Sequence, residues 1–311
     1  MFKKIAPREA FGRTLVELGE KNSNIVVLDA DLVSSTKTSY FKERFPDRFI
    51  EVGIAEQNMI GIAAGLSTCG FIPFATTFAC FASRRVCDQV MISVAYPKLN
   101  VKIVGAYLGI FVGKNGATHQ SLEDIAIMRS IPNMVIIEPV DELETEQVIK
   151  FAAEYSGPMY IRIGRDPIPS IVPEDYNFQL GKALTLKEGS DITFISCGAM
   201  IEDTLKVASL IEKKSIKARV INMSSIKPID EEAIIKAAEE TRKIVTVENH
   251  NIIGGLGSAV SEVISERIPV KVKRIGVKDV FAKSGTNEEI KKKFGLRVVD
   301  IEKEVMKFLK S

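Results

Sequence analysis

The sequence lacks an excess of either charge, because 42 lysine and arginine residues stand against 40 aspartate and glutamate residues in a chain of 311. The resulting net charge of +2 gives no basic footprint for nucleic acid or for a membrane surface. No apolar run reaches the length of a membrane span. The opening MFKKIAPREAFGR has a basic pair but no apolar stretch after it, so we expect no signal peptide. A partner made of nucleic acid or lipid is therefore not expected.

Cysteine and histidine are also scarce. The four cysteines show no CxxC pair and no zinc-type spacing, and they lie among apolar or small residues. This pattern is typical of reduced thiols in a cytoplasmic protein. Histidine chemistry is confined to His119 and His250.

Short apolar runs alternate with segments of helical spacing, in a composition of 46% apolar and 26% charged residues that is typical of globular proteins. This alternation predicts a parallel sheet with helices on both faces. In the first half we expect strands at 24–31, 48–54, 71–77, 100–107, 134–140 and 158–164, and helices at 8–22, 55–70, 81–96, 121–131 and 141–155.

A proline-rich stretch with little periodicity, RDPIPSIVPEDYNFQLGKA, then indicates a linker. A second alternating set follows it, so the chain has room for two domains. Here we expect strands at 191–198, 217–223, 243–249 and 270–277, and helices at 200–214, 230–241, 254–267, 287–296 and 300–309.

The stretch EVGIAEQNMIGIAAGL places Glu56 among apolar residues, where a strand passes into a helix. Open α/β sheets bind ligands at this edge. One interpretation is an ordinary first-turn acid, favoured by the helix dipole. The other is a desolvated acid, whose burial favours the neutral form and lets the carboxyl share a proton with a ring nitrogen. Its apolar neighbours would be Ile54, Met59, Phe78 and Phe81.

Other segments also have both a structural and a functional interpretation. Phe78 and Phe81 are either a core pair on one helix face or a platform for a flat ring. His119 follows a glycine-rich loop and either caps a helix or binds a substrate. The GGLGS turn after His250 either packs a helix closely or holds an anion. No Walker loop is present, and no GxGxxG follows the first strand.

Several arginines are either surface residues or phosphate ligands, and Arg162 and Arg165 follow a predicted strand toward the ligand edge. The set is Arg8, Arg84, Arg85, Arg162 and Arg165.

Four segments together, EVGIAEQNM, FIPFATTF, GATHQSLEDIAIMRSIPNMVIIEPVD and ENHNIIGGLGSAV, resemble the C-terminal half of transketolase over nearly the whole chain. The resemblance implies an α/β fold of two doubly wound domains. A parallel-sheet thiamine pyrimidine-binding domain would span 1–170, a linker 171–185, and a smaller mixed-sheet transketolase C-terminal domain 186–311. It also implies thiamine diphosphate-dependent transfer of a two-carbon ketol unit from a ketose phosphate to an aldose phosphate.

The same resemblance assigns roles to single residues. Glu56 would hydrogen-bond the aminopyrimidine ring nitrogen and favour the imino tautomer, which removes the proton from the thiazolium carbon. Phe78 and Phe81 would form the pyrimidine pocket, Asp31 would lie near the thiazolium, and His119 would act on the substrate. The remaining substrate and phosphate contacts would be Arg8, Ser35, Arg165 and Arg162.

One motif of thiamine enzymes is missing, because the sequence has no GDG for the magnesium and the diphosphate. We therefore expect a separate N-terminal subunit that holds Mg²⁺ and the diphosphate. Two such pairs would form a heterotetramer, with homodimerisation through this chain.

The chain also departs from the family pattern. Lys114 and Asn115 replace two acids of the loop, Tyr107 stands where many transketolases have another substrate histidine, and Arg84 where some have a tyrosine. These changes leave the sugar specificity open.

The rival interpretations are a 1-deoxyxylulose-5-phosphate synthase-like chain, a 2-oxoacid dehydrogenase beta-type subunit, and a non-catalytic regulatory or structural paralogue. AYLG in place of an IDR run counts against the first, and the NGATHQ loop against the second. The combined presence of Glu56, Phe78, Phe81 and His119 counts against the third.

Overall fold

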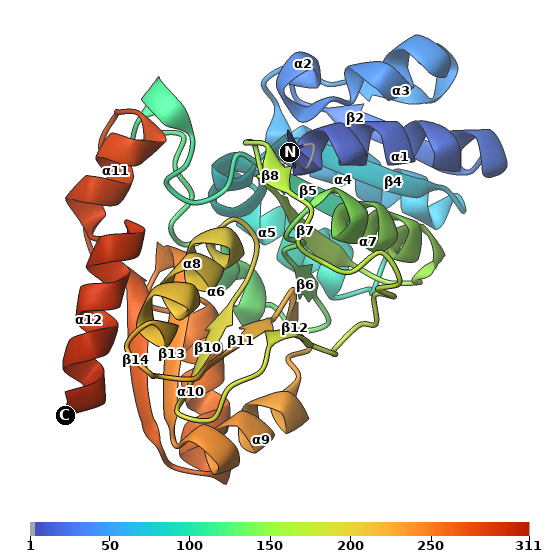
Figure 1. The fold of residues 1–311 in the computed structure, drawn as a ribbon. Helices are drawn as coiled ribbons and strands as arrows, with labels where there is room; N and C mark the ends of the chain where they lie inside the picture. Colours follow the sequence, from blue (N-terminus) through green and yellow to red (C-terminus); the bar gives the residue numbers. More distant parts are fainter. Residues whose placement is uncertain (1–3, 311) are drawn as a thin grey trace.

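Two large sheets organise the molecule, and the computed structural model describes residues 4–310. Figure 1 shows the blue-to-green half of the chain at the upper right and the orange-to-red half at the lower left. A small antiparallel ribbon of β1 (Lys4–Ile5) and β8 (Ile168–Pro169) ties the start of the chain to the end of its first half.

The first sheet has seven strands in the order β12-β6-β7-β5-β4-β2-β3. All neighbours are parallel except β12, which pairs antiparallel with β6 at the edge. The strands are β2 (Ile25–Asp29), β3 (Phe49–Glu51), β4 (Ile72–Phe78), β5 (Lys102–Ala106), β6 (Val135–Ile137), β7 (Met159–Ile163) and β12 (Ser225–Lys227).

Helices cover both faces of this sheet because successive strand residues point to opposite sides. Ile25 and Val27 of β2 pack with one set of helices, whereas Val26 and Leu28 pack with the other. The first set is α1 (Pro7–Lys21), α3 (Ser39–Arg44) and α7 (Glu142–Glu154), and the second is α4 (Glu56–Thr68), α5 (Cys87–Gln89) and α6 (Asp124–Ser130). The short helix α2 (Val33–Thr36) follows β2.

The segment after β4 departs from its expected form. We expected a helix over 81–96, and this span is helical, but π-helical turns at Phe81–Arg85 and Val90–Ala95 flank the short α5. Such turns are rare and occur frequently at functional sites. Several candidate residues lie in the first of these turns.

The second sheet has five strands in the order β14-β13-β10-β11-β9, with β9 antiparallel to its neighbour. Helices α8 and α12 pack on one face, and α9 and α10 on the other. The strands are β9 (Leu184–Lys187), β10 (Ile192–Ser196), β11 (Ala218–Asn222), β13 (Lys243–Asn251) and β14 (Lys271–Val277), and the helices are α8 (Met200–Glu212), α9 (Glu231–Thr241), α10 (Leu256–Arg267), α11 (Asn287–Phe294) and α12 (Val298–Lys310). The two architectures confirm the expected fold class.

The two halves share one core rather than meeting at a loose joint. Strand β12, from the second half, completes the first sheet by pairing Ser225 with Ile137. The expected domain bounds place this strand in the second domain, although it belongs to the first sheet. Met128 of α6 and Ile234 of α9 belong to the same buried cluster. The expected linker also packs, because Phe178 is buried against α7.

None of the helices within residues 4–310 combines the length and the apolarity needed to cross a bilayer. Cys69, Cys80, Cys87 and Cys197 are all free cysteines.

Candidate active site

The candidate site lies at the carboxyl edge of the first sheet, where the ends of β2, β4, β5 and β7 come together. Parallel strands direct their following loops to the same edge, so residues far apart in the sequence meet there. Asp31 follows β2 and Ser35 lies in the short helix α2. β4 ends at Phe78, and Tyr107 and Arg165 follow β5 and β7.

Glu56 begins α4 and is 2% exposed. Both of its carboxylate oxygens accept hydrogen bonds from Nη1 of Arg85, at 2.8 Å each. The guanidinium of Arg85 lies 4.3 Å from the centre of the Phe81 ring. Glu56 is thus both a first-turn residue and a buried acid, so the two interpretations of the sequence are not exclusive.

The expected apolar setting of Glu56 is partly wrong. Met59 is buried, but Ile54 is 77% exposed and does not enclose the carboxyl. Burying a carboxylate without a partner is costly, and the guanidinium of Arg85 supplies that partner. From the sequence, Arg85 was expected only as a surface residue or a phosphate ligand. The usable signal was its position four residues after Phe81, on the same side of one helical turn.

Four rings gather beside this acid. The rings of Phe78 and Phe81 are stacked with centres 6.1 Å apart, and Tyr107 lies 4.4 Å from Phe78. His119 meets Phe78 and Phe81 edge-on, at 6.0 and 5.5 Å. The structure therefore brings Glu56, both phenylalanines and His119 into one neighbourhood, which suits a flat ring with a polar nitrogen.

Two arginines lie on either side of Tyr107. Arg8 donates from Nη1 to the Tyr107 hydroxyl at 2.8 Å and to the backbone oxygen of Ser35 at 2.9 Å. The guanidinium of Arg165 lies 5.1 Å from the Tyr107 ring centre. A surface cavity of about 420 Å³ is lined by both arginines, by Lys4 and Arg13, and by one acid, Glu9. This concentration of positive charge is suited to an anionic group.

The loop that carries Asp31 and Ser35 is fixed by Asp29. The Asp29 carboxylate accepts from the hydroxyls of Thr36 and Thr38 and from the backbone N–H of Leu32. Burial raises the pKa of Asp29 to about 6, against the opposing effect of these hydrogen bonds. Asp31 itself is exposed, and its backbone N–H donates to Glu51. The sequence did not predict this role of Asp29, because an acid at the end of a strand has the same sequence pattern whether it binds a loop or a ligand.

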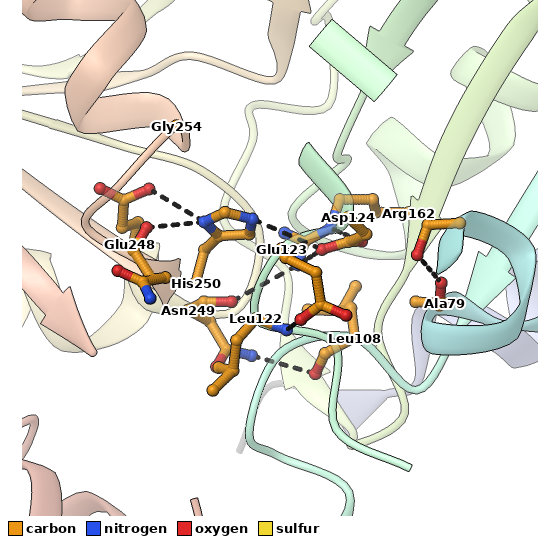
Figure 2. Close-up of polar contacts among 12 residues, drawn as sticks. Ala79, Leu108, Leu122, Glu123, Asp124, Arg162, Glu248, Asn249, His250 and Gly254 are labelled. Atoms are coloured by element: carbon orange, nitrogen blue, oxygen red, sulfur yellow. Dashed lines mark hydrogen bonds and ion pairs between the residues drawn. The ribbon is translucent and has the colours of Figure 1, made fainter. Parts of the chain in front are cut away.

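Arg162 requires a correction, because it is fully buried and all its contacts lie within the protein. It pairs with Glu138. It also pairs with Asp124, at 2.7 Å from Nε, and its Nη2 lies 3.4 Å from the backbone oxygen of Asn249 (Figure 2). Tyr160 also donates to Asp124, at 2.7 Å. The assignment of Arg162 as a substrate-binding residue is therefore wrong in this arrangement.

The GGLGS turn binds a carboxylate of the protein itself. Glu248 accepts from the backbone N–H of Gly257 at 3.0 Å, at the start of α10. A Cβ on Gly255 would lie 2.0 Å from Glu248, so the turn requires glycine there. His250 is buried beside it, and burial lowers the pKa of His250 to about 4. The close-packing interpretation of this turn thus holds, and its hydrogen-bond acceptor is the Glu248 side chain of the protein itself.

Within residues 4–310, no three histidine, cysteine or acidic side chains gather in a way that could hold a metal ion.

Comparison with known proteins gives matches over both halves of the chain. Residues 3–169 match the transketolase pyrimidine-binding domain, and residues 181–301 match the transketolase C-terminal domain. The chain is 45% identical to a 6-deoxy-6-sulfo-D-fructose transketolase subunit of Clostridium, over 94% of this chain and 91% of that one. It is 42% identical to an apulose-4-phosphate transketolase subunit of Phocaeicola vulgatus, over 98% of each. Its fold matches a split-gene transketolase described as an inactive β4 tetramer, with a TM-score of 0.92, 49% identity, and coverage of 98% of this chain and 99% of that one.

Proposed function

This chain belongs to the transketolase family as the C-terminal half of a split enzyme, and we propose that it is the subunit which activates thiamine diphosphate for ketol transfer. In the proposed reaction, a two-carbon unit passes from a ketose bearing an anionic group to an aldose acceptor. When bound, the thiazolium ring of the cofactor supplies the carbon nucleophile that carries this unit.

The observation that carries the proposal is the buried carboxyl of Glu56 beside the stacked rings of Phe78 and Phe81. Stacked phenylalanines would hold an aminopyrimidine ring by its faces. Glu56 would then hydrogen-bond a ring nitrogen and hold the proton there in a site shielded from water. Arg85 would have to release at least one Glu56 oxygen, and its half-exposed side chain leaves it room to turn toward solvent.

The substrate would enter from the side of His119 and Tyr107. Asp31, on the exposed loop after β2, would lie toward the thiazolium, and His119 would contact the ketose near the reacting carbon. Arg8 and Arg165 would bind the terminal anion, with Ser35 on the same loop edge. A phosphate and a sulfonate are both tetrahedral anions, and the named relatives include subunits for both kinds of sugar.

A separate N-terminal subunit would hold the diphosphate and Mg²⁺. The absence of a GDG motif supports this arrangement, as does the subunit naming of the relatives. The related split-gene protein is described as inactive when it forms a β4 tetramer. We therefore expect this chain alone to associate with itself without activity, and to be active in a heterotetramer with its partner.

The test is co-purification with the N-terminal subunit, followed by turnover assays with thiamine diphosphate and Mg²⁺. The donors would be ketose phosphates, apulose 4-phosphate and 6-deoxy-6-sulfofructose. Glu56→Gln should reduce turnover by about 100-fold or more. Glu232→Gln, which changes an exposed first-turn acid of α9 away from the site, is the matched control. Unchanged turnover in the Glu56 variant would remove the catalytic assignment, and turnover by this chain alone would overturn the two-subunit arrangement.

A further inference from the structure

We infer that Asn249, in the second domain, is a positioning residue for the His119 loop (residues 107–121), and this inference rests on the proposed function. Asn249 lies near the end of β13 and is 2% exposed. Its side-chain oxygen accepts from the N–H of Ile110 at 2.9 Å. Its side-chain nitrogen donates to the oxygen of Leu108 at 3.2 Å (Figure 2). One amide from the second domain thus satisfies both backbone groups of a turn in the first.

The turn is shaped to receive this amide. Gly109, between the two bonded residues, has φ of +60°, and a Cβ there would lie 2.2 Å from Asn249 Cγ. Leu108 and Ile110 are both buried, so water cannot replace the lost partner easily. Removing the amide would therefore leave a buried donor and a buried acceptor unpaired.

The far end of the loop is held by the same domain. The oxygen of Gly109 accepts from the N–H of Ser121 at 3.0 Å, which bridges the two ends. The N–H of Asn251 donates to the oxygen of Leu122 at 3.0 Å, and the side chain of Gln120 donates to the backbone oxygen of Lys283 at 3.1 Å. The residues on either side of Ser121 are thus anchored by the second domain.

The backbone conformation of Tyr107 is a second, independent sign that the loop must be held in place by its surroundings. It has φ of +58°, a conformation that residues other than glycine rarely adopt. Such backbone persists when the surrounding structure fixes it. Tyr107 directly precedes the turn held by Asn249, and its ring contacts Phe78 and Arg8. Loss of the amide would let Tyr107 and the loop relax together.

Asn249 is itself held in place. Its backbone oxygen lies 3.4 Å from Nη2 of Arg162, and Arg162 is paired with Asp124 and Glu138 inside the domain interface. The buried network drawn in Figure 2 therefore connects to the loop through Asn249. This gives the second domain a role in the site although none of the candidate catalytic residues belongs to it.

The first test follows hydrogen exchange in the isolated full chain, so it does not depend on the partner or on activity. Asn249→Ala should speed exchange of the Ile110 and Ser121 amides by about 5- to 10-fold or more. The control is Thr193→Val, which removes a buried hydroxyl pair with Thr241 elsewhere in the second domain. Unchanged exchange in residues 108–121 of the Asn249 variant, or equal acceleration in the control, would overturn the inference.

The second test uses the reconstituted complex. Asn249→Ala should lower kcat/KM for the ketose by about 10- to 100-fold, because small displacements of a substrate-positioning group have effects of this size. Its dissociation constant for thiamine diphosphate should stay within about 2-fold of wild type, because Glu56, Phe78 and Phe81 lie outside the loop. Thr193→Val should keep wild-type kcat/KM. The positioning role would be overturned if the variant lost cofactor binding to the same extent, or if its kcat/KM were unchanged. If the wild-type complex showed no ketol transfer, the proposed function would be refuted. The hydrogen-exchange result alone would then decide the role of Asn249.

Discussion

Glu248→Gln should make the chain more stable at alkaline pH. The Glu248 side chain is fully buried, and one of its oxygens accepts from Gly257. Burial raises the pKa of Glu248 from 4.5 to about 8, and the N–H groups at the start of α10 and the charges of Arg162 and Arg274 oppose this rise. The folded chain therefore keeps a proton on this carboxyl at pH values where the unfolded chain has lost it.

The sign and the size of the effect follow from this difference. Between pH 4.5 and pH 8 the folded state binds one proton more than the unfolded state at this group, so the free energy of unfolding falls as the pH rises. At about 1.36 kcal/mol for each pH unit, the whole interval corresponds to about 5 kcal/mol. Glutamine has the shape of the protonated acid and keeps the acceptor for Gly257, but it does not titrate.

The assay is urea unfolding of wild type and variant between pH 5 and pH 9. We expect nearly equal stabilities at the acid end and an advantage of the variant that grows to at most about 5 kcal/mol at the alkaline end. Glu266→Gln, an exposed position on the same helix α10, is the control and should show no such growth. Parallel curves for wild type and the Glu248 variant would refute a protonated Glu248, and an advantage that shrinks with rising pH would show that its carboxylate is ionised and stabilising.

Three further substitutions test the interface, the loop and a helix end by urea unfolding. Arg162→Met should cost about 3–5 kcal/mol by leaving Asp124 with an unpaired buried charge, and a loss below about 1 kcal/mol would contradict the pairing. Gly109→Ala should destabilise the wild-type chain by about 2 kcal/mol or more, because the new Cβ clashes with the Asn249 side chain. In an Asn249→Ala background this clash is absent and the loss should be smaller. Equal losses in the two backgrounds would contradict the contact between Gly109 and Asn249. Thr286→Ala should cost about 1 kcal/mol through loss of the capping box of α11, and no loss would show that this helix end is held by packing.

The fold followed from the sequence because its strongest signals are local. The run at Ile25–Asp29 is apolar because both faces of β2 are buried, and α1 begins at Pro7 with the helical spacing of its core residues. The strand β12 was not predictable in this way. Its three residues form a strand only because they pair with β6 at Ile137, about 90 positions earlier. No local pattern encodes such a partner.

The sequence predicted which residues form the candidate site, but it did not predict which cation pairs with the Glu56 carboxylate. Glu56, Phe78, Phe81 and His119 meet as expected, because the carboxyl ends of parallel strands converge. The partner of Glu56, Arg85, comes from the π-helical turn that also carries Phe81.

The buried network between the domains shows why spacing could not separate Arg162 from Arg165. Three carboxyls, those of Asp124, Glu138 and Glu248, lie in the neighbourhood of one guanidinium. Burial would raise the pKa of Asp124, but the two-point contact with Arg162 outweighs burial and leaves that pKa below its ordinary value. Burial keeps the pKa of Glu138 raised in spite of the same arginine.

The guanidinium therefore outweighs burial at one of these acids, whereas burial keeps the pKa of the other two raised. An arginine that must neutralise a buried acid is not available to a phosphate, whereas Arg165, two positions beyond the end of β7, lies beside Tyr107 at the surface cavity. The distinction depends on the surroundings of each arginine. Arg162 is fully buried against Asp124 and Glu138 and beside the backbone of Asn249, whereas Arg165 is only partly buried and lines the surface cavity.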